Sequence, residues 1–274
     1  MKMAMIMGMD IGSGTSKSVI VRDGKPVAYH LLPFGIDYRA VAQKLREEIL
    51  AMAGLSAADI ADTIATGQGA GNAAFSGQQA SDILCCARGI TSIFPSVRTI
   101  IDVQRTFTQV IRLNTTGHVI NFVINEKCAT GSGCFLDIIS HVLQIDLKDA
   151  GPLSLRSDNP VVFTTGCAVF GESEAISRVS EGASREDILA GVHQALASKI
   201  STLVDRVGLE MDCAMSGGGA LNIGLVGSVE KKLGFKLLVP ERPQFINAIG
   251  AAMMAENGEK TGGSLPEPER KKIN

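Results

Sequence analysis

Two cysteines, Cys128 and Cys167, occupy positions where a thiolate could react or bind a metal cluster. In the segments "NEKCATGSG" and "TTGCAVFGESEAIS", Cys128 and Cys167 each end an extended stretch just before a predicted helix. The positive end of a helix dipole and its free N–H groups stabilise a thiolate or an anionic cluster there. A [4Fe–4S] cluster takes four thiolates, so two per chain suffice only if a two-fold dimer brings both pairs to its axis. Taken without the rest of the sequence, burial in the core explains these two thiols more simply.

Four further cysteines have a simpler interpretation. Cys85 and Cys86 are adjacent, Cys134 follows "GSG" on a predicted helix, and Cys213 lies in a predicted strand. The sequence contains no C-x2-C pair, which argues against a zinc ribbon or knuckle. Disulfides are rare in a reducing compartment. We therefore expect these four to be packed, structural thiols.

Glycine-rich segments provide a second kind of chemistry. "DIGSGTSK", from Asp10 to Lys17, places two glycines and three hydroxyl residues in a turn between two predicted strands. Glycine allows the close backbone approach that phosphate oxygens need, and hydroxyl groups add donors. The segment is neither a Walker A loop nor a dinucleotide fingerprint, because a strand follows it. Taken alone, a glycine-rich hairpin is usually just a tight turn. As a phosphate loop, its nucleotide-binding residues are Gly12, Ser13, Gly14, Thr15, Ser16 and Lys17.

The elements around that turn recur later in the chain. The first thirty residues predict a strand ending at Asp10, a turn, and two further strands; "VRTIIDVQRTFTQVIRLNTTGHVINFVIN" repeats the pattern, with its first strand ending at Asp102. Helices are predicted at 37–53, 81–90, about 134–144, 168–181 and 185–207, and in "FINAIGAAMMA". A late strand, "DCAMSGGG", leads into another glycine loop and a helix. We expect a duplicated α/β fold with a cleft between its halves.

The domain boundaries follow from this repeat. We expect one subdomain at residues 1–98 plus 244–258, a second at 99–243 that carries both candidate cysteines, and a disordered polar tail at 259–274.

Composition narrows the class of protein. The chain has 274 residues, a net charge of −2, 30 glycines and only 4% aromatic residues, as many α/β proteins do. Without a basic surface, neither nucleic acid nor anionic lipid is an expected partner. No run reaches the roughly 18 apolar residues of a membrane helix, and the short apolar start fits a buried strand better than a signal peptide. We expect a cytoplasmic protein.

Three loops together resemble a nucleotide-binding superfamily. "DIGSGTSK", the segment after Asp102 and "SGGGALN" resemble the two phosphate loops and the adenosine loop of the actin, sugar-kinase and heat-shock ATPases. The resemblance implies an actin-like ATPase fold in which two α/β subdomains enclose a nucleotide cleft. It also implies that Asp10 and Asp102 act on magnesium and water, with Gly217, Gly218 and Gly219 near the adenosine of ATP.

A more specific resemblance includes the cysteines. "GMDIGSGTSKSVIV", "ATGQGAG", "NEKCATGSGCFLDII", "DNPVVFTTGCAVFGESEAIS", "DILAGVHQALASKI" and "AMSGGGALN" resemble, in that order, the BadF/BadG/BcrA/BcrD ATPases, which drive electrons into 2-hydroxyacyl-CoA dehydratases and benzoyl-CoA reductases. The resemblance implies a dimer that binds one MgATP per subunit and shares one [4Fe–4S] cluster, held here by Cys128 and Cys167 of each chain. It further implies a ferredoxin or flavodoxin donor and a catalytic iron–sulfur reductase or dehydratase as acceptor.

The chain departs from the family pattern at the second phosphate loop. Where dehydratase activators carry an Asp–x–Gly–Gly–Gln–Asp type of sequence, this chain has "DVQRTF", with Gln104 and Arg105 at the glycine positions and Phe107 at an acidic one. This loss favours a D-type subunit of benzoyl-CoA reductase, paired with a related but different ATPase subunit. The alternatives are a homodimeric dehydratase activator and a partner subunit that binds nucleotide without hydrolysing it. A small-molecule kinase or a nucleotide-binding regulator would leave the thiols unexplained.

Overall fold

The computed structural model describes residues 5–125, 131–164 and 168–259. The chain forms two compact units. The first comprises Met1–Val97, Leu113–Ile120 and Phe245–Pro266; the second comprises Arg98–Arg112, Asn121–Gln244 and Glu267–Asn274. Residues 260–274, which make up nearly all of the predicted disordered tail, lie outside the described residues.

A five-stranded sheet forms the centre of the first unit, in the order β3-β2-β1-β4-β5. Strand β1 (Met5–Ile11) pairs antiparallel with β2 (Thr15–Arg22), which pairs antiparallel with β3 (Lys25–Pro33). On its other side β1 pairs parallel with β4 (Ile60–Thr66), next to the short β5 (Gln78–Gln79). The predicted meander at the start of the chain is confirmed, and it leaves the carboxyl ends of β1 and β4 side by side.

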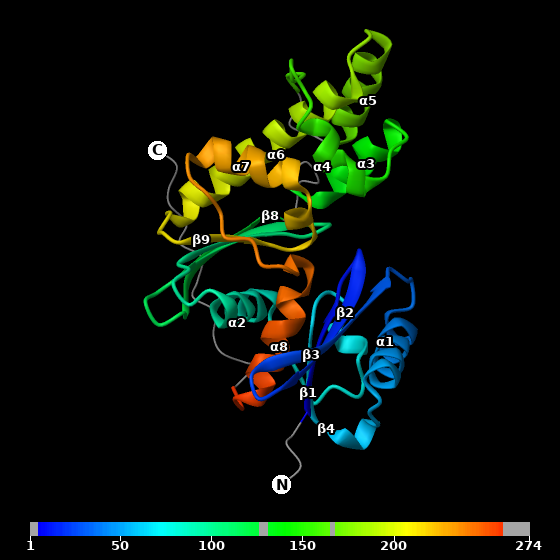
Figure 1. The fold of residues 1–274 in the computed structure, drawn as a ribbon, viewed down its shortest axis with the longest axis vertical. Coiled ribbons are helices and arrows are strands. Elements are labelled where there is room, and N and C mark those ends of the chain that lie inside the picture. The colour runs from blue at the N-terminus through cyan, green and yellow to red at the C-terminus, as the bar shows by residue number, and fades with distance from the viewer. Residues whose placement is uncertain (1–4, 126–130, 165–167, 260–274) are drawn as a thin grey trace. The chain divides into compact units, whose positions relative to one another are not determined.

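Three helices complete the first unit: α1 (Tyr38–Ala53), α2 (Asp82–Ile93) and α8 (Ile246–Glu256). Helix α1 starts at an Asp37 side-chain cap and ends at Gly54, which adopts a left-handed conformation. Leu45 and Ile49 of α1 share one apolar core with alternate residues of β1. Helix α8 packs against β1, β4 and α2, as Figure 1 shows, and its buried sequence is accordingly apolar all round.

The second sheet has four strands in the order β8-β7-β6-β9. Strand β6 (Thr99–Val103) pairs antiparallel with β7 (Thr108–Leu113), which neighbours β8 (Val119–Asn125). Strand β6 also pairs parallel with β9 (Cys213–Ser216). Each central strand is therefore flanked by an antiparallel strand that follows it in sequence and by a parallel strand that arrives much later.

Among the described residues, the second unit contains five helices: α3 (Gly133–Val142), α4 (Leu147–Ser154), α5 (Ala168–Ser180), α6 (Arg185–Val207) and α7 (Ile223–Leu233). Helix α6 packs against α4 and α7, and its buried residues join those of the sheet in one core. The sequence predicted every one of these helices except α4. Short 3-10 turns occupy Ala57–Asp59, Ala70–Asn72, Gly218–Leu221 and Pro243–Phe245. Within the described ranges, no helix is long and apolar enough to cross a membrane.

Candidate functional site

The first candidate acid is Asp10, at the carboxyl end of β1. Its side chain is almost fully buried, and Lys17 Nζ lies 3.2 Å from its Oδ2 atom. Asp10 and Lys17 are direct cross-strand partners in the β1–β2 ladder, so the sheet register itself brings the two side chains together. The predicted residues Asp10 and Lys17 thus form a buried ion pair.

The rest of the predicted phosphate turn lies between these partners. Gly12, Ser13 and Gly14 connect the two strands, and Thr15 and Ser16 begin β2. The turn is held to the edge of the sheet because the Phe34 N–H donates to the Gly14 carbonyl at 3.1 Å. The six residues that the sequence predicted for nucleotide binding are therefore contiguous in space with Asp10.

A glycine from the neighbouring strand approaches the same carboxylate. Gly67 directly follows β4 and has a φ of +90°. A Cβ at Gly67 would lie 2.6 Å from Asp10 Oδ1, closer than side chains tolerate. The Gly67 N–H donates to Asp82, which also accepts from the Thr66 hydroxyl. Neither Gly67 nor Asp82 was identified from the sequence, although "ATGQGAG" was one of the resembling segments.

The second candidate acid, Asp102, lies at the equivalent place on β6 and is fully buried. Gln104 Nε2 lies 3.0 and 3.1 Å from its two carboxylate oxygens. Gln109 Nε2 donates to Oδ2 at 2.9 Å, and the Ser216 hydroxyl donates to Oδ1 at 3.0 Å. Three neutral groups therefore hydrogen-bond this carboxylate, and none of the three was identified from the sequence.

The predicted adenosine loop begins beside Asp102. Gly217 follows β9 with a φ of +81°, and a Cβ there would lie 2.7 Å from Asp102 Oδ1. Gly219 is packed against Val103, whereas an added Cβ at Gly218 would meet open space. Gly217, Gly218 and Gly219 thus stand at one end of the second sheet, next to the acid.

The two acids occupy duplicated settings. Asp10 pairs with Lys17 on the antiparallel neighbour and with Thr66 on the parallel neighbour. Asp102 pairs in the same register with Gln109 and Ser216. In both settings a left-handed glycine follows the parallel strand and covers the carboxylate. The register of the two sheets was the signal that would have identified Gln109 and Ser216.

The second phosphate loop is fastened to helix α3. The N–H groups of Gly133 and Cys134 donate to the carbonyls of Gln104 and Arg105, at 2.9 and 2.7 Å. Arg105 Nε also pairs with Asp137 Oδ2 at 2.9 Å. The Arg105 guanidinium is therefore engaged by a carboxylate of α3. Residues 104 and 105 and the first turn of α3 form one hydrogen-bonded assembly.

The two predicted cluster ligands, Cys128 and Cys167, lie outside the described residues. Among the residues that the structure describes, no group of three or more His, Cys, Asp and Glu side chains is placed to hold a metal ion. Cys85, Cys86 and Cys213 are buried, and burial raises the pKa of the Cys85 thiol and raises that of Cys213 to about 12. Cys134 is half-buried at the start of α3. Neutral, packed thiols at 85 and 213 agree with their expected structural role.

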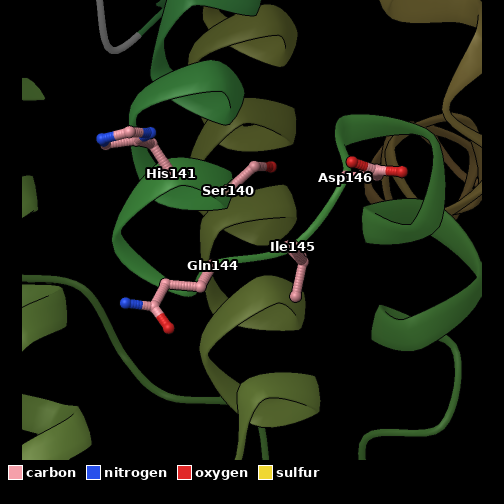
Figure 2. Close-up of a pocket in the computed structure, with 5 residues that line it drawn as sticks. All are labelled: Ser140, His141, Gln144, Ile145 and Asp146. Carbon is pink, nitrogen blue, oxygen red and sulfur yellow. The ribbon is translucent and has the colours of Figure 1, made fainter.

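A small pocket of about 370 Å³ lies at the other end of α3. Figure 2 shows its lining, in which Ser140 and His141 come from the last turns of the helix and Gln144, Ile145 and Asp146 come from the connection to α4. None of the predicted site residues lines it. The pocket is therefore separate from the predicted site.

The described residues suit a magnesium–nucleotide complex. Buried carboxylates provide oxygen ligands for Mg²⁺ or accept hydrogen bonds from its bound waters. Each acid stands beside a glycine turn whose backbone approaches without an intervening side chain. The set is chemically apt for holding a hydrated divalent cation and phosphate oxygens.

Comparison with known proteins identifies a family and several proteins that are similar to this chain. The sequence profile of the BadF/BadG/BcrA/BcrD ATPase family matches residues 7–255. The 2-hydroxyisocaproyl-CoA dehydratase activator of Clostridioides difficile is 38% identical over 250 residues, which cover 91% of this chain and 94% of that protein. The D-type subunit of benzoyl-CoA reductase from Thauera aromatica is 32% identical over 263 residues, which cover 92% of this chain and 93% of that protein.

A solved structure agrees with these matches. The activator of the 2-hydroxyisocaproyl-CoA dehydratase from Clostridium difficile, with bound ADPNP, superposes with a TM-score of 0.89 at 37% identity. The superposition covers 93% of this chain and 95% of that one. The higher identity to the activator favours the alternative drawn from the sequence over the benzoyl-CoA reductase interpretation. The chain belongs to the BadF/BadG/BcrA/BcrD ATPase family and has its actin-like α/β fold.

Proposed function

We propose that this protein is an ATP-dependent activator of a 2-hydroxyacyl-CoA dehydratase, which delivers a low-potential electron to that enzyme. The observation that carries the proposal is its similarity, over nearly the whole length of both chains, to the dehydratase activator of Clostridioides difficile. The duplicated acid settings supply the matching chemistry, because each places a buried carboxylate beside a glycine turn.

In this proposal the two acids serve MgATP. Asp10 and Asp102 accept hydrogen bonds from magnesium-bound waters, and Asp102 orients the water that attacks the γ-phosphate. Gly12, Ser13, Gly14, Thr15, Ser16 and Lys17 hold phosphate oxygens, and Gly217, Gly218 and Gly219 hold the adenosine. The first and second subdomains of this active form are residues 1–98 plus 244–258 and residues 99–243.

Cys128 and Cys167 are the proposed ligands of a [4Fe–4S] cluster. Two thiolates per chain account for half of the four that the cluster takes, so a second, homologous chain supplies the rest. The sequence predicts that each thiol precedes a helix start, and the positive end of a helix dipole suits a thiolate ligand. When bound, the cluster supplies one-electron transfer. The proposed partners are a ferredoxin or flavodoxin donor and the catalytic iron–sulfur dehydratase, all in the cytoplasm.

A second candidate function rests on the altered phosphate loop. Gln104 and Arg105, at the glycine positions of the family pattern, favour a D-type subunit of a benzoyl-CoA reductase, paired with an unlike ATPase subunit. In that setting the partner hydrolyses ATP while this chain binds it. The 32% identity to the D-type subunit from Thauera aromatica is consistent with this candidate.

Anaerobic purification tests the cluster. The brown protein is expected to contain about two iron atoms per chain, the share of each subunit in one four-iron cluster. Cys128→Ala and Cys167→Ala are each expected to remove the colour and the iron. Cys134→Ala, at the start of α3, is the matched control and is expected to retain both. Colourless, iron-free wild type under these conditions contradicts the proposal.

Reconstitution separates the two candidate functions. With a low-potential reductant, the reduced protein and MgATP are expected to activate a 2-hydroxyacyl-CoA dehydratase, measured as loss of water from the substrate. Electron delivery that proceeds without ATP contradicts both candidates. Activity only together with a second, unlike ATPase subunit, and with benzoyl-CoA as substrate, establishes the second candidate instead.

A further inference from the structure

The two acids differ in how their charge is balanced. Asp10 faces the Lys17 ammonium at 3.2 Å, with both side chains almost fully buried. Asp102 accepts hydrogen bonds from the amides of Gln104 and Gln109 and from the Ser216 hydroxyl. The cross-strand partner is thus an ammonium at the first carboxylate and an amide at the second.

The three donors to Asp102 come from different kinds of element. Gln109 lies on β7 and Ser216 on β9, both buried in the sheet. Gln104 lies in the connection after β6, and its side chain spans both carboxylate oxygens. Rotation of the Gln104 side chain releases both oxygens on that side without disturbing either strand.

The backbone of Gln104 makes hydrogen bonds of its own, separate from those of its side chain. Its N–H donates to the Phe107 carbonyl at 2.9 Å, and its carbonyl accepts from the Gly133 N–H at 2.9 Å. The carboxamide is held by Asp102 in the hydrogen bonds described above. At the equivalent place after Asp10 the chain has Gly12, with no side chain. The arrangement around the acid is thus repeated in the two halves, except that the second half has the Gln104 carboxamide where the first has no side chain.

We propose that Gln104 is a positioning residue that gates Asp102. Its carboxamide hydrogen-bonds both carboxylate oxygens, and it must rotate away before magnesium-bound water can take its place. This inference rests on the proposed function, because it assigns the acid to MgATP. The gate lowers the benefit of magnesium to nucleotide binding and slows hydrolysis.

Nucleotide binding with and without magnesium tests the gate. A non-hydrolysable ATP analogue is titrated calorimetrically into wild type and Gln104→Ala, in Mg²⁺ and in EDTA. The dissociation constant in EDTA is divided by the dissociation constant in Mg²⁺. This ratio is the factor by which magnesium tightens nucleotide binding, and we call it the benefit of magnesium. Removal of a hydrogen bond to a charged group is expected to raise this ratio on the order of tenfold in Gln104→Ala, with a matching rise in the hydrolysis rate. Gln43→Ala, which removes an amide from Glu47 on the exposed face of α1, is the matched control and is expected to leave the ratio unchanged.

A second variant and a folding measurement keep the outcomes distinct. Gln109→Ala removes a donor that belongs to the sheet, so Asp102 loses its orientation and the benefit of magnesium is expected to fall. Thermal unfolding of each variant establishes that it is folded. If folded Gln104→Ala shows an unchanged or smaller benefit of magnesium, the gate is overturned. The proposed function then still stands, provided that the wild type binds nucleotide and activates a dehydratase. Wild type that binds no nucleotide overturns the proposed function as well.

Discussion

A buried carboxylate requires hydrogen-bond donors or a counter-charge, and the two halves of this chain supply them differently. At Asp10 the antiparallel neighbour supplies the Lys17 ammonium; at Asp102 it supplies the Gln109 amide. Breaking a buried ion pair by removing one partner leaves an uncompensated charge, which is strongly destabilising. An amide in place of the ammonium leaves the carboxylate hydrogen-bonded, as the second half demonstrates.

Substitution of Lys17 tests this difference directly. Lys17→Ala is expected to lower the free energy of unfolding by about 3–5 kcal/mol, because Asp10 stays buried without a cation. Lys17→Gln copies the arrangement of the second half and is expected to lose less. Chemical denaturation of both variants measures the losses. Equal losses would show that charge, rather than hydrogen bonding, decides the stability of this pair.

The glycine that covers Asp102 gives a second prediction at the residue scale. Gly217→Ala introduces a Cβ 2.7 Å from the carboxylate oxygen at a φ of +81°. Gly234→Ala places a Cβ at a φ of +85° with nothing within 4 Å, so it carries the backbone strain alone. We expect a loss of about 1–2 kcal/mol at Gly234, and about 3 kcal/mol or more at Gly217, where overpacking is added.

Thermal or chemical unfolding of the two variants measures the difference. Nucleotide affinity is expected to fall in Gly217→Ala and to be retained in Gly234→Ala, which lies at the end of α7. Similar stability and affinity in the two variants would show that the atoms around Asp102 move to accept the added Cβ at little cost.

At the scale of elements, helix α3 and the second phosphate loop are one assembly. Two backbone hydrogen bonds and the Arg105–Asp137 pair join them. Both side chains of the pair are partly exposed, so the pair itself adds little to global stability. It restrains the backbone of the loop, and it connects the loop beside Asp102 to the helix that follows the segment containing Cys128.

Asp137→Asn tests that connection. We expect a loss in the free energy of unfolding below about 1 kcal/mol, together with faster hydrogen exchange at the amides of Gly133 and Cys134, because the restraint on the loop is weaker. Hydrogen exchange measured by NMR or mass spectrometry reports both amides. Lys44→Gln, which breaks the exposed Lys44–Glu48 pair on α1, is the control and is expected to leave these amides unchanged. Unchanged exchange in Asp137→Asn would mean that the backbone bonds alone hold the loop.

The elements were largely predictable, and the reasons are local. Apolar runs separated by glycine-containing turns predicted the strands, and apolar residues at helical spacing predicted α1, which ends at Gly54. Helix α4 was missed because it is short and contains Pro152, which usually breaks a helix. Asp10 and Asp102 were predicted as site residues because each comes at the end of a strand. The Gln104 and Gln109 contacts were missed because a side chain's partner depends on sheet register and rotamer, which no local pattern carries.

At the scale of the whole molecule, the two units reach stability by different routes. The first unit depends on helix α8, the last described element, to cover the sheet that begins the chain. The second depends on a polar group within its helical layer. His193 of α6 is fully buried, and its Nδ1 atom lies 2.9 Å from the hydroxyl of Ser154 on α4. The Ser154 hydroxyl donates to the Gly151 carbonyl, so the imidazole donates to that hydroxyl from Nδ1.

The buried imidazole makes the stability of the second unit dependent on pH. Burial lowers the pKa of His193 from 6.5 to about 4. The folded state therefore resists protonation, and its stabilising contribution is complete above pH 6.5 and is lost as the pH falls toward 4. Between pH 7 and pH 5 this histidine is expected to lower the free energy of unfolding by about 2 kcal/mol.

Denaturant unfolding monitored in the second unit at the two pH values measures this loss. His193→Gln, which keeps an amide donor for Ser154 but does not titrate, is expected to reduce the pH dependence, even though it lowers stability at pH 7. His118→Gln, on the exposed turn before β8, is the matched control and is expected to keep the pH dependence of the wild type. An unaltered pH dependence in His193→Gln would assign the acid sensitivity to other groups and remove His193 from this account, because its protonation alone predicts the loss.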